Sequence, residues 1–102
     1  MLKLEFNLGE IVANEEHIRE LEFQNDSEYY YKIMKLLPHC PCITIMEFSD
    51  SIVAPDDVFK VKYKIKKTYL GKGSTKIDFT LGSPYADYKY GVITINYDVI
   101  HK

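Results

Sequence analysis

The sequence predicts one β-rich domain, and its alternation, composition and length carry this prediction. Apolar residues alternate with lysines over residues 59–66, and with polar residues at 77–81 and 93–99. Successive side chains of a strand point to opposite faces of a sheet, so this period of two is typical of half-buried antiparallel strands. Nine Tyr and no Trp fit this interpretation, because aromatic residues pack well on pleated surfaces. A chain of 102 residues has room for one core, so we expect a single domain over 1–102.

Two short strands are predicted in the first part of the chain. Leu4, Phe6 and Leu8 alternate with polar residues, and a glycine then ends the run. Leu21 and Phe23 alternate in the same way with Glu and Gln neighbours. Both segments therefore resemble strands that bury one face.

Residues 26–37 carry two conflicting patterns. Four apolar residues follow one another at helical spacing behind a capping aspartate: Tyr30, Ile33, Met34 and Leu37. Alternate positions of the same segment, Tyr29, Tyr31 and Ile33, also fit a strand. Periodicity alone slightly favours the helix. That alternative would make the protein an α+β domain with one helix at 26–37 packed on an antiparallel sheet.

The second half contains the clearest strand patterns. Another strand begins at residues 43–45, and residues 55–57 form a turn before the strand at 59–65. The glycine-rich residues 71–74 are predicted to be the turn of a hairpin that joins 59–65 to 77–81.

The last strand alternates over 93–99, and this alternation is out of phase with Tyr88 and Tyr90. A β-bulge adds one residue to a strand, so that the alternation before the bulge and the alternation after it can face the same side. We therefore expect a bulge at Gly91.

The order of short motifs resembles a known domain family. The landmarks are Phe6-Asn7-Leu8-Gly9-Glu10-Ile11, Leu21-Glu22-Phe23-Gln24-Asn25, Ile33, His39-Cys40-Pro41-Cys42-Ile43, Ile52-Val53-Ala54-Pro55 and Val58 to Tyr63. This series resembles a bacterial family of immunoglobulin-like domains of unknown function, related to hydin-like and major-sperm-protein domains. Members have a Phe-x-Phe-Gly-x-Ile start, a Phe-x-Phe-x-Asn strand, a Ser-Cys-Gly-Cys-Thr segment and an Ile-x-Pro-Gly turn.

The resemblance implies an all-β, immunoglobulin-like β-sandwich of about seven strands, in which residues 29–37 form a strand. Three positions depart from the family pattern, because Pro41 and Asp56 each stand where Gly is usual and His39 replaces Ser. Members occur mostly in exported or cell-envelope proteins and have no established catalytic activity. The resemblance therefore implies a scaffold or recognition role and no cofactor.

His39, Cys40 and Cys42 allow three interpretations. Imidazole and thiolates are suitable ligands of zinc or copper, although a fourth ligand would have to be His17, His101 or a carboxylate, or come from a second chain. The two thiols also allow a redox disulfide, but an extended i to i+2 pair spans about 6.6 Å. A bridge therefore needs a tight turn centred on Pro41 and would be readily reduced. The third interpretation makes both cysteines small apolar residues that fill a strand corner.

Two groups of tyrosines are candidate partner-binding residues: Tyr29, Tyr30 and Tyr31, and Tyr85, Tyr88 and Tyr90. A strand buries only alternate positions, so some of these side chains must face outward. Exposed tyrosines are enriched at protein interfaces because they supply large amphipathic contact area. We expect their partner to be another protein or a second copy of the chain.

Charge and hydropathy disfavour other partners. The formal net charge is −2, which provides no overall attraction to nucleic acid. The lysine ladder at 60, 62, 64 and 66 is interpreted as a solvated outer face that also discourages edge pairing. The longest apolar run falls far short of the ~20 residues that span a bilayer, so no membrane insertion is expected. The N-terminus lacks the pattern of a secretion signal, which fits either a cytoplasmic protein or a trimmed domain of an exported one.

The sequence therefore predicts a non-catalytic protein-binding or structural module. The alternative function is a thiol redox or metal-handling protein that uses His39, Cys40 and Cys42.

Overall fold

Seven strands and no helix make up the computed structural model, which describes residues 1–102. They are β1 (Leu2–Val12), β2 (His17–Gln24), β3 (Lys32–Pro38), β4 (Ile43–Phe48), β5 (Val58–Ile65), β6 (Gly71–Gly82) and β7 (Lys89–Ile100). No helix is present that is long and apolar enough to cross a membrane.

The helix considered for residues 26–37 is wrong. Residues 26–30 form bends and a loop, and β3 follows from Lys32. The burial pattern shows why the strand forms, since Tyr31 and Ile33 are buried whereas Tyr30 and Met34 are exposed. A helix would have placed Tyr30 and Met34 on its buried face instead. The strand-like alternation of Tyr29, Tyr31 and Ile33 was therefore the pattern that indicated the structure of this segment.

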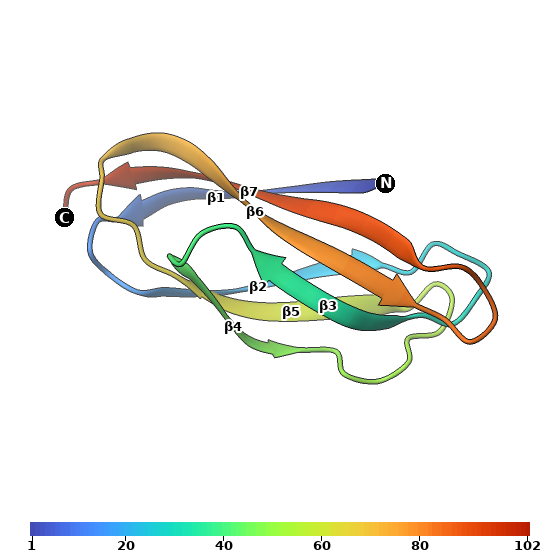
Figure 1. The fold of residues 1–102 in the computed structure, drawn as a ribbon. Coiled ribbons are helices and arrows are strands. Elements are labelled where there is room, and N and C mark those ends of the chain that lie inside the picture. The colour runs from blue at the N-terminus through green and yellow to red at the C-terminus, as the bar shows by residue number, and fades with distance from the viewer.

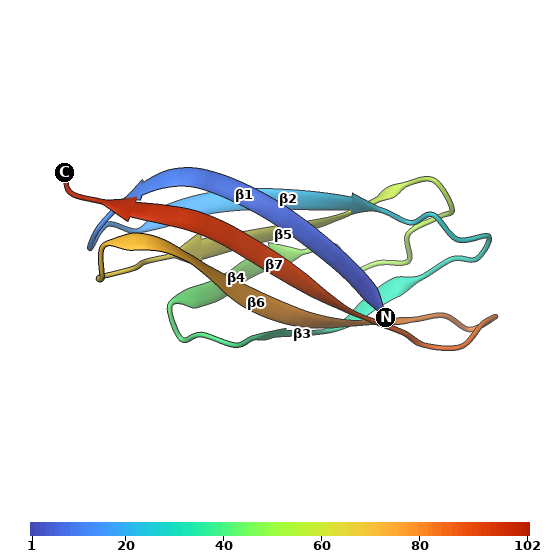
Figure 2. The same cartoon turned by 90° about the horizontal axis from the view of Figure 1, so that it is seen from above.

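The strands form two sheets that face each other (Figures 1 and 2). One sheet has the order β1-β7-β6-β3 and the other has the order β2-β5-β4. β1 runs parallel to β7, and every other pair of neighbours is antiparallel. Because consecutive strands often change sheet, the chain crosses repeatedly between the layers and encloses one core. The result is an elongated sandwich of 48 × 22 × 21 Å.

Alternate residues of both sheets fill the core. The largest side chains that are fully buried are Tyr63, Phe59, Phe79, Ile11, Ile65, Ile77, Ile93, Ile95, Val61 and Val99. Three rings join the two layers, because Phe23 lies 5.0 Å from Phe59 and 5.2 Å from Phe79 between ring centroids. Aromatic pairs at these separations add to the stability gained from burial alone.

The hairpin predicted between 59–65 and 77–81 is wrong. β5 pairs with β2 on one side and β4 on the other, so it has no free edge for β6. Residues 66–70 instead carry the chain to the other sheet, where Gly71 and Gly73 already belong to β6. Strand alternation identified both strands but contained no information about which neighbours they pair with.

The bulge predicted at Gly91 is also absent, because β7 pairs with β6 without a register shift from Lys89 to Val99. The side chain of Tyr90 is exposed, whereas Gly91 is buried. A Cβ on Gly91 would collide with the ring of Phe79 and approach the carbonyl oxygen of Leu2. The glycine is thus required by a close approach between strands, which is a common reason for glycine inside a sheet.

Bulges occur in three of the four edge strands. Register shifts lie between Asn7 and Glu10 in β1, between Ile33 and Lys35 in β3, and between Ile45 and Glu47 in β4. Bulges at sheet edges hinder pairing with another chain.

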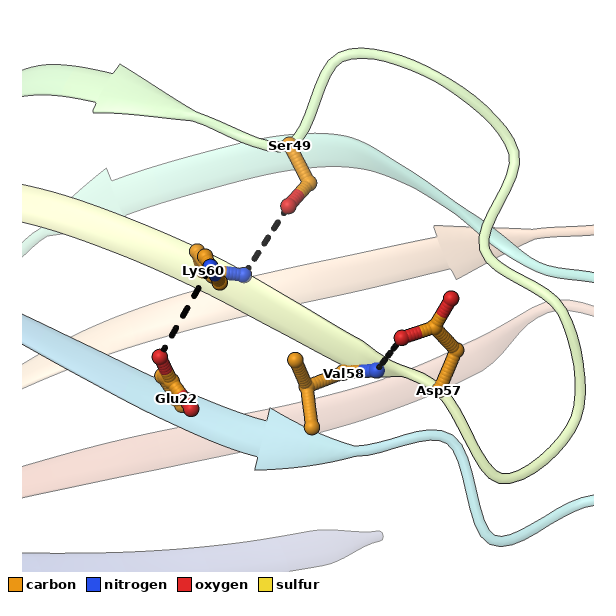
Figure 3. A network of polar contacts seen from close by, with 5 residues as sticks. All are labelled: Glu22, Ser49, Asp57, Val58 and Lys60. Atoms are coloured by element: carbon orange, nitrogen blue, oxygen red, sulfur yellow. Dashed lines mark hydrogen bonds and ion pairs between the residues drawn. The ribbon is translucent and has the colours of Figure 1, made fainter.

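The lysine ladder lies on the outer face of β5, as predicted. Lys60 Nζ lies 3.9 Å from Glu22 Oε1, and Lys64 Nζ lies 2.7 Å from Glu16 Oε2. Figure 3 shows the end of this face, where the backbone N–H of Lys60 donates to Ser49 Oγ at 2.9 Å and that of Val58 donates to Asp57 Oδ1 at 2.9 Å. Two of the four ladder lysines thus have an acidic partner.

Candidate binding surface and the cysteine turn

Asn25 holds together two loops at one end of the sandwich. Its backbone N–H donates to Asp57 O at 2.8 Å, and its Nδ2 donates to Tyr29 O at 2.9 Å and to Val53 O at 3.0 Å. Its Oδ1 accepts from Ser27 Oγ at 2.7 Å. The side chain is buried, so these bonds replace water and fix the course of the loop before β3. This loop carries the first tyrosine group.

Tyr31 does not belong to an exposed surface, which corrects its assignment as a binding residue. It is 2% exposed, and its backbone exchanges two hydrogen bonds with Val53 at 3.1 and 2.7 Å. Its hydroxyl donates to Asp87 O at 3.0 Å, and Lys89 Nζ lies 5.3 Å from its ring centroid. Tyr31 therefore anchors the loop between β6 and β7.

The other five candidate tyrosines are exposed: Tyr29, Tyr30, Tyr85, Tyr88 and Tyr90. Tyr29 and Tyr30 lie in the loop between β2 and β3, and Tyr85 and Tyr88 lie in the loop between β6 and β7. Both loops are at the same end of the sandwich, on the right in Figure 1. The two loops lie far apart in the sequence, so residue order alone does not reveal that they lie at the same end.

Tyr88 is the centre of a larger apolar surface. Met34 and Tyr88 approach Gly82 so closely that a Cβ there would lie 2.7 Å from Met34 Cγ and 3.0 Å from Tyr88 Cε1. Ile52 and Pro84 line the same shallow hollow of about 200 Å³. On its other side Tyr88 lines a second hollow of about 640 Å³. This second hollow is lined by Met1, Leu2, Tyr88, Lys89 and Tyr90.

We define the Tyr88 surface by the residues Met1, Leu2, Met34, Ile52, Pro84, Tyr88 and Tyr90. Its central side chains are largely exposed, at 59% for Tyr88, 60% for Tyr90 and 55% for Met34. Lys32 and Lys89 also line the two hollows. The surface thus combines apolar and aromatic contact area with two positive charges.

Sequence reasoning missed Met34 and Ile52 as parts of this surface. The register shift between Ile33 and Lys35 leaves Met34 without a partner on β6, and it lies exposed. No periodic signal identifies a bulge of this kind. Ile52 was interpreted as part of a turn motif and lies exposed.

Cys40 and Cys42 form a disulfide in the turn between β3 and β4. Their Cα atoms are 5.1 Å apart, closer than in an extended strand, and Ile43 N–H donates to Cys40 O at 3.1 Å. This is the tight turn around Pro41 that a bridge requires. Both cysteines are partly exposed, and Cys42 packs against the edge of the core.

His39 lies beside this turn but interacts with another strand. Its Nε2 lies 2.9 Å from Asp78 Oδ2, and its backbone N–H donates to Lys76 O at 2.8 Å. No group of three His, Cys, Asp or Glu side chains is arranged to hold a metal ion. His17, one candidate for the fourth ligand, binds the backbone of Val12 instead, since its Nε2 lies 3.1 Å from the nitrogen and 3.2 Å from the oxygen.

Two ionisable groups have shifted pKa values, and both lie away from the Tyr88 surface. Burial raises the pKa of Tyr63 to about 12, and the positive charge of Arg19 opposes this shift. The hydrogen bond and charge of Lys64 lower the pKa of Glu16. Desolvation and ion pairing in the sheet explain these shifts.

Solved structures share this arrangement of strands. The PapD-like domain 7 of human CEP192, also described as an ASH domain, matches with a TM-score of 0.69 at 10% identity, over 96% of this chain and 82% of that one. The fold is an immunoglobulin-like β-sandwich. At this identity the likeness shows the fold alone.

Two further structures contain the same sandwich. The VesB protease of Vibrio cholerae matches with a TM-score of 0.74 at 10% identity over 94% of this chain, which spans 30% of that protease chain. A protein of unknown function from Porphyromonas gingivalis W83 matches with a TM-score of 0.67 at 11% identity, over 96% of this chain and 45% of that one. No protein-family model and no curated protein matches the sequence.

Proposed function

We propose that this chain is a non-catalytic protein-binding module and that its partner packs against the Tyr88 surface. The observation that carries the proposal is that Tyr88 meets Met34 beside Gly82 and shares a second hollow with Tyr90, with each of the three side chains more than half exposed. Contiguous exposed apolar side chains are costly in water and are typical of interaction sites. Tyrosine contributes strongly to such interfaces because it loses little conformational entropy on binding.

The chemistry of the surface favours one kind of partner. The two hollows accept apolar side chains, and Lys32 and Lys89 attract acidic residues around them. A protein segment with one or two apolar anchors and flanking Asp or Glu residues meets both requirements. The lysine ladder gives less support to a nucleic-acid partner, since Lys60 and Lys64 already face Glu22 and Glu16.

The partner binds through its side chains rather than by adding a strand. β3, the edge strand that contains Met34, carries a register shift and ends at Pro38. A bulge and a proline both interrupt the regular row of backbone groups that strand addition needs.

The proposed relationship to the bacterial immunoglobulin-like family has structural support at two of the quoted motifs. Asn25, the last residue of the Phe-x-Phe-x-Asn-like strand, is the buried hub of the two loops. Asp56, which stands where the family has Gly, has a φ of 69°. Glycine is favoured at such positions because it lacks a Cβ.

Site-specific photo-crosslinking tests the proposed function. Benzoylphenylalanine is placed at position 88 in one variant and at position 62, on the outer face of β5, in a control variant. Both are expressed in the native cells and irradiated. We expect a discrete crosslinked species from position 88, and we expect Tyr90→Ser to reduce its yield. Equal crosslinking from positions 88 and 62, or none from position 88, would contradict the proposal.

A further inference from the structure

The disulfide turn connects the two sheets and is fixed by backbone hydrogen bonds. It lies between the last residue of β3 and the first residue of β4. His39 N–H binds Lys76 O on one side, and Lys66 N–H donates to Cys42 O at 3.1 Å on the other. These two hydrogen bonds anchor the turn at both ends.

Each sulfur faces a hydrogen-bond donor. The backbone N–H of Cys42 donates to Cys40 Sγ at 3.2 Å. The ammonium group of Lys67 lies 3.9 Å from Cys42 Sγ. Lys67 Nζ also lies 5.5 Å from the ring centroid of Tyr97, a contact that helps to keep the charge beside the sulfur. Donors and positive charges around a sulfur stabilise the thiolate, which is the reactive form of cysteine.

We propose that Cys40 and Cys42 form a reversible redox centre that exchanges with small thiols and disulfides, and that Lys67 stabilises the thiolate of Cys42. This activity is independent of the proposed binding function. It requires thiols that are reachable from solvent, and both cysteines are partly exposed.

The exchange proceeds in two steps. The thiolate of a small thiol such as glutathione attacks Cys40 Sγ and forms a mixed disulfide, while the bond to Cys42 breaks and Cys42 leaves as a thiolate beside Lys67. A second glutathione thiolate attacks the glutathione sulfur of the mixed disulfide, which releases glutathione disulfide and leaves Cys40 as a thiolate. The protein thus gains two electrons from two thiols, and solvent supplies the protons. The reverse sequence oxidises the protein at the expense of glutathione disulfide.

The choice of Cys40 as the attacked sulfur follows from packing. Cys42 lies against the edge of the core and beside the ammonium group of Lys67, so it is the better leaving group. In the reverse direction the Cys42 thiolate displaces glutathione from Cys40.

Equilibration in glutathione buffers, followed by alkylation and mass spectrometry, tests the redox centre. We expect the fraction of oxidised protein to change reversibly with the ratio of glutathione to its disulfide, with both forms populated. A protein that stays fully oxidised in excess glutathione would show that the bond is structural and would overturn the proposal. A protein that forms no internal disulfide in excess glutathione disulfide would overturn it equally.

The role of Lys67 is tested by the rate of reduction at neutral pH. Lys67→Met removes the positive charge and should slow reduction by glutathione by about 3- to 10-fold, because the leaving thiolate of Cys42 becomes less stable. Lys67→Arg should retain most of the rate, and Lys66→Met serves as the matched control with an unchanged rate. Thermal unfolding of each oxidised variant checks that the fold is intact. Equal rates for Lys67→Met and Lys66→Met would overturn the assignment of Lys67.

Discussion

The side-chain amide of Asn25 donates to the carbonyl oxygen of Val53 at 3.0 Å, although 28 positions separate the two residues. This bond joins the loop before β3 to the loop before β5 and is buried. Val53 in turn pairs with the backbone of Tyr31. The end of the sandwich that carries the exposed tyrosines is thus organised by one amide group.

Asn25→Ala should lower the free energy of unfolding by about 2 to 4 kcal/mol, because it leaves buried backbone groups without partners. Chemical denaturation followed by circular dichroism measures this change. Gln24→Ala is the matched control, since Gln24 makes one exposed hydrogen bond to Asp56 O at 3.2 Å. We expect a change within about 0.5 kcal/mol for this control. Equal effects of the two substitutions would contradict the central role of Asn25.

Gly91→Ala should destabilise the protein by about 1 to 3 kcal/mol, because the added methyl group overpacks the core against Phe79. Denaturation of Gly91→Ala, Phe79→Leu and the double variant forms a double-mutant cycle. We expect the double variant to be more stable than the sum of the two single changes predicts. Simple additivity would show that the methyl group and the ring do not compete for the same space.

Asp56→Gly should raise the free energy of unfolding by about 0.5 to 1 kcal/mol, because φ is 69° at this position and glycine adopts such a conformation without a Cβ penalty. Asp57→Gly provides the control and should destabilise, since Asp57 Oδ1 accepts a hydrogen bond from Val58 N–H. Differential scanning calorimetry gives the melting temperatures, which we expect to be highest for Asp56→Gly, intermediate for the wild type and lowest for Asp57→Gly. A lower melting temperature for Asp56→Gly than for Asp57→Gly would refute the argument.

Tyr63 makes stability depend on alkaline pH. Its pKa in the folded protein is about 12 against an ordinary value of 10.0, so the native state binds the phenolic proton more tightly than the unfolded state does. The stability linked to this group is fully present below pH 10 and is lost as the pH rises through 12. Tyr63→Phe removes the titrating group. Its free energy of unfolding should therefore fall less than that of the wild type between pH 10 and 12, and equal slopes would contradict the shift.

Strand positions were predictable from the sequence because a strand that buries one face has alternating apolar and polar residues. The alternation at 59–65, 77–81 and 93–99 corresponds to β5, β6 and β7. Pairing was harder to predict, because β5 and β6 have the same alternation whether they form a hairpin or lie in opposite sheets. The positions of Asn25 and Tyr31 as anchors also depend on contacts with residues more than twenty positions away.

The candidate surface was predictable only in part. The sequence predicted that some of the six candidate tyrosines face outward, because a strand buries only alternate positions. Tyr88 and Tyr90 are exposed, but Tyr31 is buried. Met34 lies at a register shift and Ile52 belongs to a loop, and neither feature has a periodic signal. The disulfide turn required a contraction around Pro41 that residue spacing allowed but did not determine.

The central claim is that the partner binds the Tyr88 surface, and the three methionines of the chain provide a direct test. Met1 and Met34 belong to this surface, whereas Met46 lines a separate hollow with Phe48 on β4. The measurement is an NMR titration. The partner identified by crosslinking is added to protein that is isotope-labelled at the methionine methyl groups. The account predicts that the Met34 and Met1 methyl signals shift or broaden while the Met46 signal stays unchanged. A shift of Met46 with Met34 unchanged, or no shift at all, would contradict it.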